Sequence, residues 1–508
     1  MTGIAATTGT ASPDPARALL TLIVLGALAR VALAAGLGLS VDESYTVAIS
    51  RELSLSYFDH PPLHLWIVGL WARLICSEQP LLLRLPDIAM FAVSTWLLCR
   101  LTSAAYGERA GLWAALALNL APVFTLNTAA GIVPDAPMVL FALLAAMLFQ
   151  RALTGAKALA PWQLPLAGAA AGLALLSKYL ALFPIFGFAA YLATRRPRWL
   201  AQPALWLAAL IVVALFTPVL AWNEAHGWVS FAFQGGRALP AGFSVTRALA
   251  AFAGQLLYLL PWTGVALLWE LARAVRRGPA DERAWLFVCL ALPAIVVFSI
   301  AALWTKVLPH WPAIGWLFAF PLLGARLAGL AEVRPRLLRA IALVSGVLLL
   351  AVLALLAWQT ATGGLARLVP ALSGHDPTVD LLDWRELETR VRQEQQRRGG
   401  LVIATVSWID AGKADYALQG AAPVLCLTQD ARQFAFRRDP RRFAGADALI
   451  VADAARPDWL NLAAPYFRVI VPQADVVITR AGRPALTLHT AYGYGLRTSQ
   501  RNARPTQR

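Results

Sequence analysis

Charged residues are scarce in this sequence. Asp, Glu, Lys and Arg make up 14% of its 508 residues, whereas a soluble globular domain carries about 25%. Four apolar stretches of about twenty residues, enough to cross a bilayer core as a helix, have almost no charge: residues 18–40, 205–222, 285–304 and 340–358. A soluble fold would have to bury several helices that are apolar all round. The sequence therefore predicts a polytopic α-helical membrane protein.

Cysteine is also scarce. The four cysteines, Cys76, Cys99, Cys289 and Cys426, are widely separated and show no CxxC pair or metal-ligand spacing. Basic residues are few at the start of the chain, which runs nearly uncharged into the first apolar stretch. This predicts an uncleaved first span rather than a signal peptide with a basic leader.

Positive charge, in contrast, is in excess, with a net charge of +16 and an isoelectric point near 10.4. In a soluble protein this balance would favour nucleic-acid binding. Here the arginines gather in short gaps between apolar runs, which is typical of cytoplasmic loops. The clusters are Arg195, Arg196 and Arg198; Arg273, Arg276, Arg277 and Arg283; and Arg326, Arg334, Arg336 and Arg339. We therefore expect membrane orientation to explain the charge, and no nucleic-acid partner.

About eleven spans fit the hydropathy pattern. They cover residues 18–38, 81–100, 109–126, 136–153, 162–177, 180–194, 203–222, 247–272, 285–304, 310–325 and 339–359. With the N-terminus inside, alternation places every strong basic cluster between spans in the cytoplasm. The pair 162–177 and 180–194 is short, and losing one member would invert everything after it. The arginine pattern favours keeping both.

The spans divide the chain into regions. We expect a cytoplasmic tail at residues 1–17, a transmembrane catalytic domain at 18–360, and an extracytoplasmic loop at 41–80 that holds two short helices. From residue 374 the composition becomes that of a soluble protein, with a polar helical segment at 380–398 and short β-rich runs at 401–408, 423–427, 448–453, 467–471 and 485–489. Residues 374–494 are predicted to form a small extracytoplasmic α/β domain, followed by a disordered tail at 495–508.

The first long loop concentrates acidic residues. Residues 41–63 read VDESYTVAISRELSLSYFDHPPL and include Asp42, Glu43, Asp59 and His60. Adjacent carboxylates beside an apolar wall have raised and split proton affinities, which suits a general base or a cation site. A solvated loop with ordinary charges is the alternative. The two prolines after His60 fix the backbone, which a mobile loop would not need.

These residues resemble a known family. The DE pair after the first span and the YFDHPPL stretch are similar to the bacterial relatives of dolichyl-phosphate-mannose protein mannosyltransferases, a group that includes lipid A aminoarabinose and galacturonosyl transferases. GIVPDAPMVLF (131–141), GLALLSKYLALF (172–183) and TKVLPHW (305–311) resemble the family's later loops, in the same order. The aminoarabinose enzymes have Glu-Lys where this chain has Asp59 and His60. The resemblance implies a GT-C membrane glycosyltransferase in a bacterial inner membrane, with its site on the periplasmic side.

The resemblance and the chemistry of sugar transfer suggest roles. A polyprenyl-phosphate leaving group needs charge stabilisation, and the acceptor needs a carboxylate to orient it or take its proton. The candidate catalytic residues are Asp42 as the base, its neighbour Glu43, and Asp135. The candidates for the donor phosphate are Lys178, Lys306 and His310. Tyr57, Asp59 and His60 are expected to shape the loop or meet the acceptor.

Several of these residues have a structural alternative. Asp135 could cap a helix, Lys178 could extend its side chain to the interface, and His310 could be an ordinary interfacial histidine. A divalent cation is left open, with Asp42, Glu43, Asp59 and His60 as candidate ligands and no spacing that identifies a metal. The segment WIDAGKADYALQG (408–420) resembles the family's outer domain, and we expect it to help select the acceptor.

The sequence therefore predicts an enzyme that moves a monosaccharide from a polyprenyl-phosphate carrier to an envelope acceptor such as lipid A or a related glycolipid. A protein hydroxyl, as in O-mannosylation, is an alternative acceptor. A transporter or flippase of lipid-linked sugars is a second alternative. Transport would favour charged or broken-helix sites near mid-bilayer, often in two related halves, whereas the acidic residues here fall in loops on one face.

Overall fold

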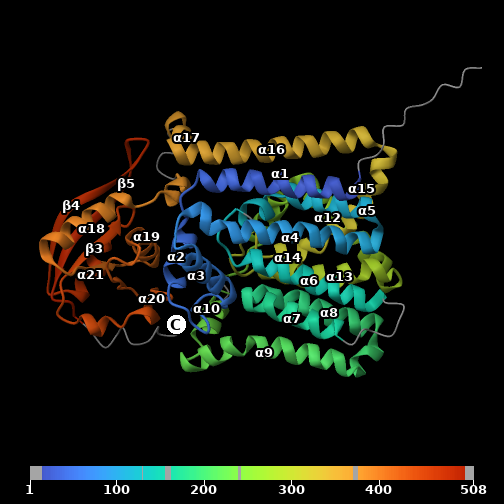
Figure 1. Ribbon diagram of the computed structural model, residues 1–508, viewed down its shortest axis with the longest axis horizontal. Coiled ribbons are helices and arrows are strands. Elements are labelled where there is room, and N and C mark those ends of the chain that lie inside the picture. The colour runs from blue at the N-terminus through green and yellow to red at the C-terminus, as the bar shows by residue number, and fades with distance from the viewer. Residues whose placement is uncertain (1–13, 129, 155–161, 238–241, 370–375, 498–508) are drawn as a thin grey trace, which may run out of the picture.

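The chain forms a bundle of helices with a smaller sheet domain at one end (Figure 1). The computed structural model describes residues 14–128, 130–154, 162–237, 242–369 and 376–497. The long bundle helices are α1 (Pro15–Ala35), α4 (Pro80–Tyr106), α6 (Asp135–Thr154), α9 (Pro203–Ala225), α13 (Glu282–Ala301), α15 (Phe320–Val333) and α16 (Pro335–Thr362). The shorter ones are α5 (Glu108–Leu120), α7 (Gln163–Ser177), α8 (Leu182–Arg195), α11 (Val245–Tyr258), α12 (Pro261–Arg277) and α14 (Ala313–Leu317). Four more helices lie at the sheet-domain end: α2 (Val41–Ser50), α3 (Leu63–Ile75), α10 (Val229–Gly236) and α17 (Gly364–Leu368).

Seven helical segments of the described chain are long and apolar enough to cross a bilayer, which confirms the polytopic architecture. They are Pro15–Ala35, Pro80–Tyr106, Asp135–Leu153, Pro203–Ala225, Glu282–Ala301, Ala313–Val333 and Pro335–Thr362. The count of eleven is not confirmed. The expected spans at 109–126, 162–177 and 180–194 correspond to α5, α7 and α8, which have 13, 15 and 14 residues.

The expected span at 247–272 is not one continuous helix. It consists of α11 and α12, which meet at an angle of 106°. Leu260 at the junction has a φ of 66°, and Pro261 has no N–H to continue the hydrogen-bond ladder of α11. The apolar composition of this stretch was sufficient for a span, but the backbone turns in its middle.

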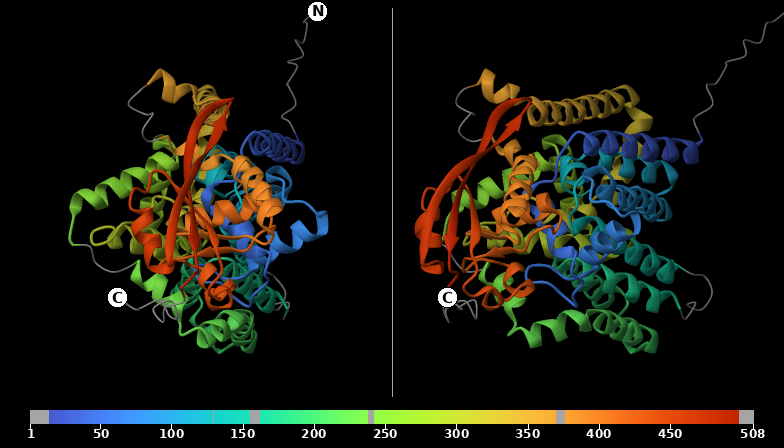
Figure 2. Two further views of the ribbon diagram at one scale, coloured as in Figure 1. Left: turned by 90° about the vertical axis from the view of Figure 1, so that its left-hand side faces the viewer. Right: turned by 60° about the vertical axis from the view of Figure 1, so that its left-hand side comes forward.

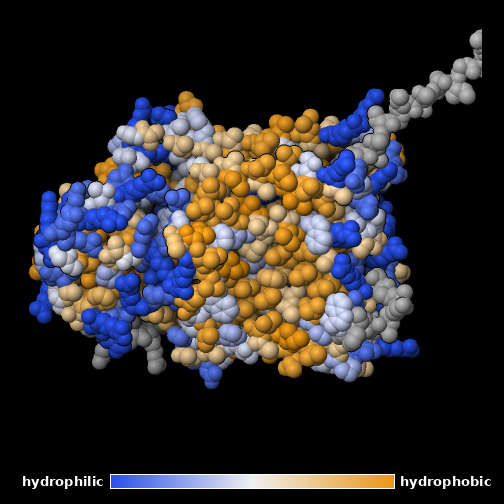
Figure 3. Space-filling model, viewed as in Figure 1, coloured by the Kyte–Doolittle hydropathy of each residue, from blue (hydrophilic) through white to orange (hydrophobic). Residues whose placement is uncertain are grey.

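Charged residues gather at the two ends of the bundle, with an apolar belt between them (Figure 3). Ion pairs join the predicted cytoplasmic loops to one another at the end away from the sheet domain: Arg109–Glu332 at 3.1 Å, Arg196–Glu282 at 2.6 Å and Arg326–Glu270 at 3.7 Å. Hydrogen bonds join the predicted extracytoplasmic segments at the other end, as in Ile132 N–H to Glu43 and Thr305 Oγ1–H to Arg237 O. The loops therefore sort into the two sets that the arginine pattern indicated.

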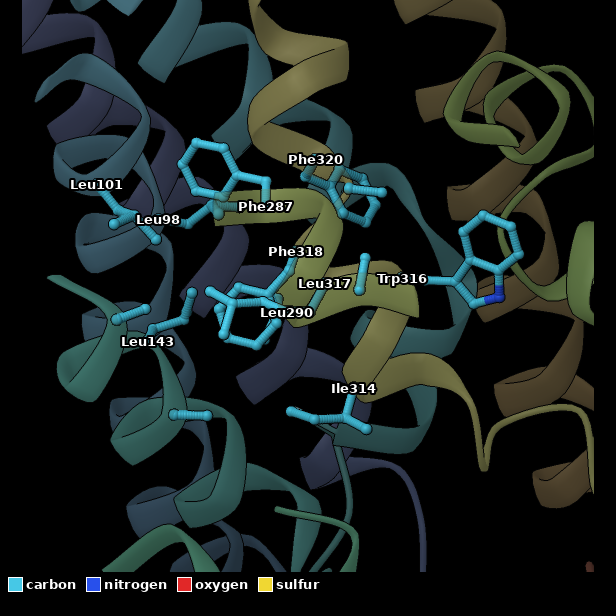
Figure 4. Close-up of a cluster of buried hydrophobic side chains, with 14 of the residues drawn as sticks. Leu98, Leu101, Leu143, Phe287, Leu290, Ile314, Trp316, Leu317, Phe318 and Phe320 are labelled. Atoms are coloured by element: carbon cyan, nitrogen blue, oxygen red, sulfur yellow. The ribbon is translucent and has the colours of Figure 1, made fainter. Parts of the chain in front are cut away.

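The core of the bundle centres on the short helix α14 and the residues that follow it. Trp316, Leu317, Phe318 and Phe320 are buried there against Leu98 of α4, Leu143 of α6, and Phe287 and Leu290 of α13 (Figure 4). The indole N–H of Trp316 donates to Gln255 Oε1 at 3.0 Å. Side chains this large leave little freedom between helices, so the helix ends that carry the polar loops are held in fixed positions.

The C-terminal domain is an α/β domain, as expected. Its sheet has the order β2-β1-β3-β5-β4. The strands are β1 (Val402–Thr405), β2 (Val424–Cys426), β3 (Ala448–Asp453), β4 (Val469–Arg480) and β5 (Arg483–Tyr494), with β1 parallel to β2 and β3. The helices are α18 (Arg385–Arg398), α19 (Trp408–Leu418), α20 (Phe434–Arg437) and α21 (Trp459–Ala463). The runs predicted at 467–471 and 485–489 belong to one long β4–β5 hairpin on the outer side of the domain (Figure 2). The run predicted at 401–408 ends earlier, because Ser407 caps α19.

The core of this domain continues into the first loop of the membrane part. Tyr45, Ile49, Tyr57 and Leu65 share one apolar cluster with residues of α18, α19 and the sheet. Arg51 forms ion pairs with Glu78 and with the buried Asp415 of α19. A junction that is both apolar and ionic fixes the domain against α2 and α3. Of the predicted tails, residues 1–13 and 498–508 lie outside the described part of the chain, and α1 already begins at Pro15.

Candidate active site

Asp42 and Glu43 lie in the first turn of α2, where a capping box begins the helix. The Ser40 side chain accepts from Glu43 N–H, and the Glu43 carboxylate accepts from Ser40 N–H at 2.8 Å. Negative side chains are favourable in a first helical turn. The i and i+1 positions point the two carboxylates in different directions. They therefore meet different surroundings, although they are adjacent in the sequence.

Glu43 is bound on every side and is only 3% exposed. It forms a bidentate ion pair with Arg84 of α4, at 2.7 and 2.8 Å, and accepts from Ile132 N–H at 2.9 Å. Burial by itself would raise the pKa of Glu43, but Arg84 holds it below its usual value. Arg84 also donates to three carbonyls at the end of α1 and just after it. Glu43 thus joins α1, α2, α4 and the loop before Asp135.

Asp42, in contrast, is exposed and has no ion-pair partner among the described residues. It opens into a cavity of about 700 Å³ between the membrane part and the C-terminal domain. Arg237, Trp408 and Arg432 line the cavity with it. Packing around the carboxyl raises the pKa of Asp42, Arg432 opposes this, and Asp59 adds to it. A carboxylate with a raised proton affinity is suited to receive a proton from a hydroxyl.

Asp59 lies behind Asp42 and is almost fully buried. It accepts from Tyr45 Oη–H at 3.3 Å, and its Oδ2 is 3.6 Å from Nη1 of Arg432. Burial raises the pKa of Asp59, and Arg432 lowers it. The loop around it is fixed by Gln433 Oε1, which accepts from Phe58 N–H, and by Tyr57 Oη–H, which donates to Glu52 O. These contacts hold the loop in place, and a role of Tyr57 and Asp59 toward the acceptor stays a prediction.

Asp135 and Lys178 form a buried ion pair of 2.6 Å at the sheet-domain end of the bundle. Asp135 is the first residue of α6, and Lys178 follows α7 at a break in the helical path. A buried ion pair adds little net stability because both charges lose their hydration, but removing one partner is costly because the other charge stays buried. The Lys178 charge is thus compensated by a carboxylate within the protein.

His60 and His310 are two of the imidazoles near this pair. Burial and then Lys178 lower the pKa of His60 to about 3 and that of His310 to about 4. Both are therefore neutral at physiological pH, and they offer hydrogen bonds rather than positive charge. Lys306 is exposed on the segment between Thr305 and the buried Val307, and it forms no ion pair within the described ranges.

Arg237 and Arg432 were not among the residues predicted for the site. Arg237 follows α10 and is exposed, and no carboxylate lies within ion-pair distance of it among the residues described. The Arg432 guanidinium lies 3.5 Å from the Trp408 ring centroid, and its backbone φ is 48°. Such a conformation is costly for a side chain larger than glycine and is often found at functional sites. No sequence signal joins these arginines to Asp42, because they come from a late loop and from the other domain.

The residues expected as metal ligands do not gather. Within the described ranges there is no group of three or more His, Cys, Asp or Glu side chains that could hold a metal ion. Glu43 faces Arg84, and Asp59 faces Tyr45 and Arg432, so these carboxylates already have partners.

Comparison with known sequences agrees with the expected relationship. Residues 59–222 match the family model described as dolichyl-phosphate-mannose-protein mannosyltransferase. The lipid A galacturonosyltransferase RgtD of Rhizobium johnstonii is 25% identical over 280 residues. This match covers 54% of the chain and 58% of RgtD, so the chain spans a little over half the length of this curated relative.

Comparison with solved structures shows the fold. The structure of ArnT from Cupriavidus metallidurans in the apo state superposes with a TM-score of 0.63 at 17% identity, over 94% of this chain and 98% of ArnT. The structure of the same protein bound to undecaprenyl phosphate gives 0.61 at 16% identity, over 93% and 97%. The chain is therefore related to the dolichyl-phosphate-mannose protein mannosyltransferases and to a lipid A galacturonosyltransferase, and it has the fold of ArnT.

Proposed function

We propose that this protein is a membrane glycosyltransferase that transfers a monosaccharide from a polyprenyl-phosphate carrier to an envelope glycolipid such as lipid A. One observation carries the proposal: an exposed carboxylate, Asp42, shares a cavity with two arginines at the end of a membrane bundle. Both the fold of ArnT, which binds undecaprenyl phosphate, and the similarity to RgtD, a lipid A galacturonosyltransferase, support it.

Each residue of the site has its own role in the proposed reaction. The accepting hydroxyl gives its proton to the Asp42 carboxylate as its oxygen bonds to the sugar C1. The bond between C1 and the phosphate oxygen breaks, and its electron pair leaves with the polyprenyl phosphate. Arg237 is the uncompensated cation best placed to stabilise that anion, with the neutral His310 as a further hydrogen-bond donor. Positive charge at C1 in the transition state is favoured by the carboxylates around it.

In this proposal Lys178 acts together with Asp135 and not as a free positive charge. Because Asp135 neutralises it, the pair presents a dipole to the donor instead of a full positive charge. The donor phosphate then needs a second cation, which Arg237 supplies from the cavity wall. We place the cavity end on the periplasmic side and the arginine clusters in the cytoplasm of a bacterial inner membrane, following the positive-inside rule.

Purified protein in detergent provides the direct test. Given a polyprenyl-phosphate sugar and lipid A, it is expected to form glycosylated lipid without any sealed membrane, because an enzyme needs no compartment. A transporter would leave both lipids unchanged under these conditions. Mass spectrometry of lipid A and of envelope proteins from a deletion strain then separates a glycolipid acceptor from a protein acceptor.

A further inference from the structure

The cavity beside Asp42 has a second wall, which the C-terminal domain supplies. Its polar residues are Asp380, Asp410, Asp453, Arg456 and Asp458. These four carboxylates and one guanidinium make this wall acidic. Arg432, which also belongs to the C-terminal domain, lies with Arg237 near Asp42, and the two arginines make that side of the cavity basic. A ligand that fills the cavity therefore meets opposite charge environments at its two ends.

Asp410 is the buried member of the acidic wall. It lies in the first turn of α19, in the WIDAGKADYALQG segment, and is only 1% exposed. The Asp453 backbone N–H donates to its carboxyl, but Oδ2 has no hydrogen-bond partner among the residues that the structure describes. Burial raises the pKa of Asp410 to about 7, and Arg456 opposes the shift. A buried oxygen without a partner is costly in a folded protein, so it points to a ligand atom.

Arg456 contributes the complementary group. Its Nε is buried and has no hydrogen-bond partner in the described part of the chain, although the guanidinium is close enough to Asp410 to act on its charge. Asp410 Oδ2, a hydrogen-bond acceptor, and Arg456 Nε–H, a donor, therefore lie near each other on the same wall, and neither has a partner among the described residues. A hydroxyl can both donate and accept, so it satisfies both groups. A phosphate only accepts, and four carboxylates would repel it; an ammonium only donates, and Arg456 would oppose it.

We propose that Asp410 and Arg456 bind hydroxyl groups of the acceptor's saccharide, so that the accepting atom is a sugar hydroxyl and not a phosphate. This inference rests on the proposed function. A displacement at the sugar C1 brings the acceptor from the face opposite the leaving phosphate. With the phosphate at Arg237, the reacting hydroxyl of the acceptor lies at Asp42, and the rest of its saccharide extends to the C-terminal domain wall. The outer domain thereby selects the acceptor through two adjacent polar groups.

The test measures binding separately from transfer. Two probes with identical acyl chains and disaccharide are titrated into the purified full-length protein without donor: a lipid A bearing both phosphates and its dephosphorylated form. The dephosphorylated probe is expected to bind at least about tenfold more tightly. Asp410→Asn and Arg456→Gln are each expected to weaken its binding about tenfold, the loss of one well-placed hydrogen bond to a charged group. Asp475→Asn, on the β4–β5 hairpin outside the cavity, is the matched control and is expected to bind like the wild type.

The outcomes separate this inference from the proposed function. Tighter binding of the phosphorylated probe by the wild-type protein overturns the inference, whatever the variants do. Wild-type affinity in both variants overturns it as well. If binding follows the expectation but no polyprenyl-phosphate sugar is transferred, the saccharide site stands and the proposed function fails. If transfer occurs and the product is an acid-labile glycosyl phosphate, the function stands and the inference fails.

Discussion

Arg432 of the C-terminal domain approaches Asp59 of the first loop, with Nη1 at 3.6 Å from Oδ2. These residues are far apart in the sequence and come from the two parts of the molecule. Arg432 also lowers the proton affinity of Asp42, which faces the same cavity. The C-terminal domain therefore contributes to the electrostatics of the proposed base and is more than a cover over it.

Removing this arginine is expected to change the pH dependence of transfer. Packing around the carboxyl raises the pKa of Asp42, and Arg432 restrains the rise, so Arg432→Gln raises the pKa further. A base must be ionised to act, so the acidic limb of kcat/KM moves to higher pH and activity at neutral pH falls. Rates measured from pH 5 to 9 check this. Arg441→Gln, an exposed arginine of the same domain, is the control and should leave the limb in place. An unshifted limb in Arg432→Gln would show that Asp42 does not act as the base.

Asp42→Asn is expected to lower transfer by a factor of about 10² to 10⁴, the usual contribution of a general base. The amide keeps the shape of the side chain but cannot take a proton. Because Asp42 has no ion pair among the described residues, the unfolding temperature should stay within about 1 °C of the wild type. A rate assay and a thermal melt in detergent measure the two effects. Near-normal turnover would rule out this residue as the base.

Glu43→Gln is expected to act mainly on stability. The change leaves Arg84 as a buried charge without its carboxylate, and breaking such a pair costs about 3–5 kcal/mol. The unfolding temperature should therefore drop by several degrees, in contrast to Asp42→Asn. Activity should fall as well, since Glu43 holds the loop that leads to Asp135. A variant that loses activity with an unchanged melt would instead place Glu43 in direct contact with substrate.

Lys178 and Asp135 are expected to behave as a coupled pair. Lys178→Met leaves the Asp135 carboxylate buried and unpaired, so the variant should lose stability and show a raised KM for the donor more than for the acceptor. Adding Asp135→Asn to Lys178→Met removes the orphaned charge. The double variant should regain stability but not donor affinity. A double-mutant cycle measured by melting and by KM separates the two effects. Additive losses in both readouts would show that the pair is not coupled.

The four native cysteines allow a test of orientation. Cys76 is exposed at the cavity end, just after α3, whereas Cys99, Cys289 and Cys426 are buried. A membrane-impermeant maleimide applied to spheroplasts should label the protein at Cys76, and Cys76→Ser should abolish the labelling. Labelling that requires lysed cells would place the cavity on the cytoplasmic side and contradict the proposed topology.

Much of the site could be found from the sequence because its motifs are local. The DE pair needs only the cap at Ser40 to begin a helix, and the prolines after His60 fix their own turn. What the motifs could not show is the partner of each carboxylate. The sequence suggested Asp42 as the base and Glu43 as its neighbour, but only the structure shows that Arg84 of another helix binds Glu43 and that Asp42 is open to the cavity. Arg237 lies in no motif that the sequence analysis singled out. Asp135 and Lys178 do lie in motifs, but nothing in those motifs shows that the two residues form an ion pair.

Bilayer thickness and the positive-inside bias act on each segment separately, so the amino-acid order alone indicates that the chain spans a membrane and which loops share an end. The bend of the apolar run 247–272 at Leu260 and Pro261, and the approach of Arg432 to the first loop, become visible only in the folded molecule. Pairing between charges depends on distances between remote segments, which packing of the whole bundle and its outer domain sets. The composition of a single segment does not determine those distances.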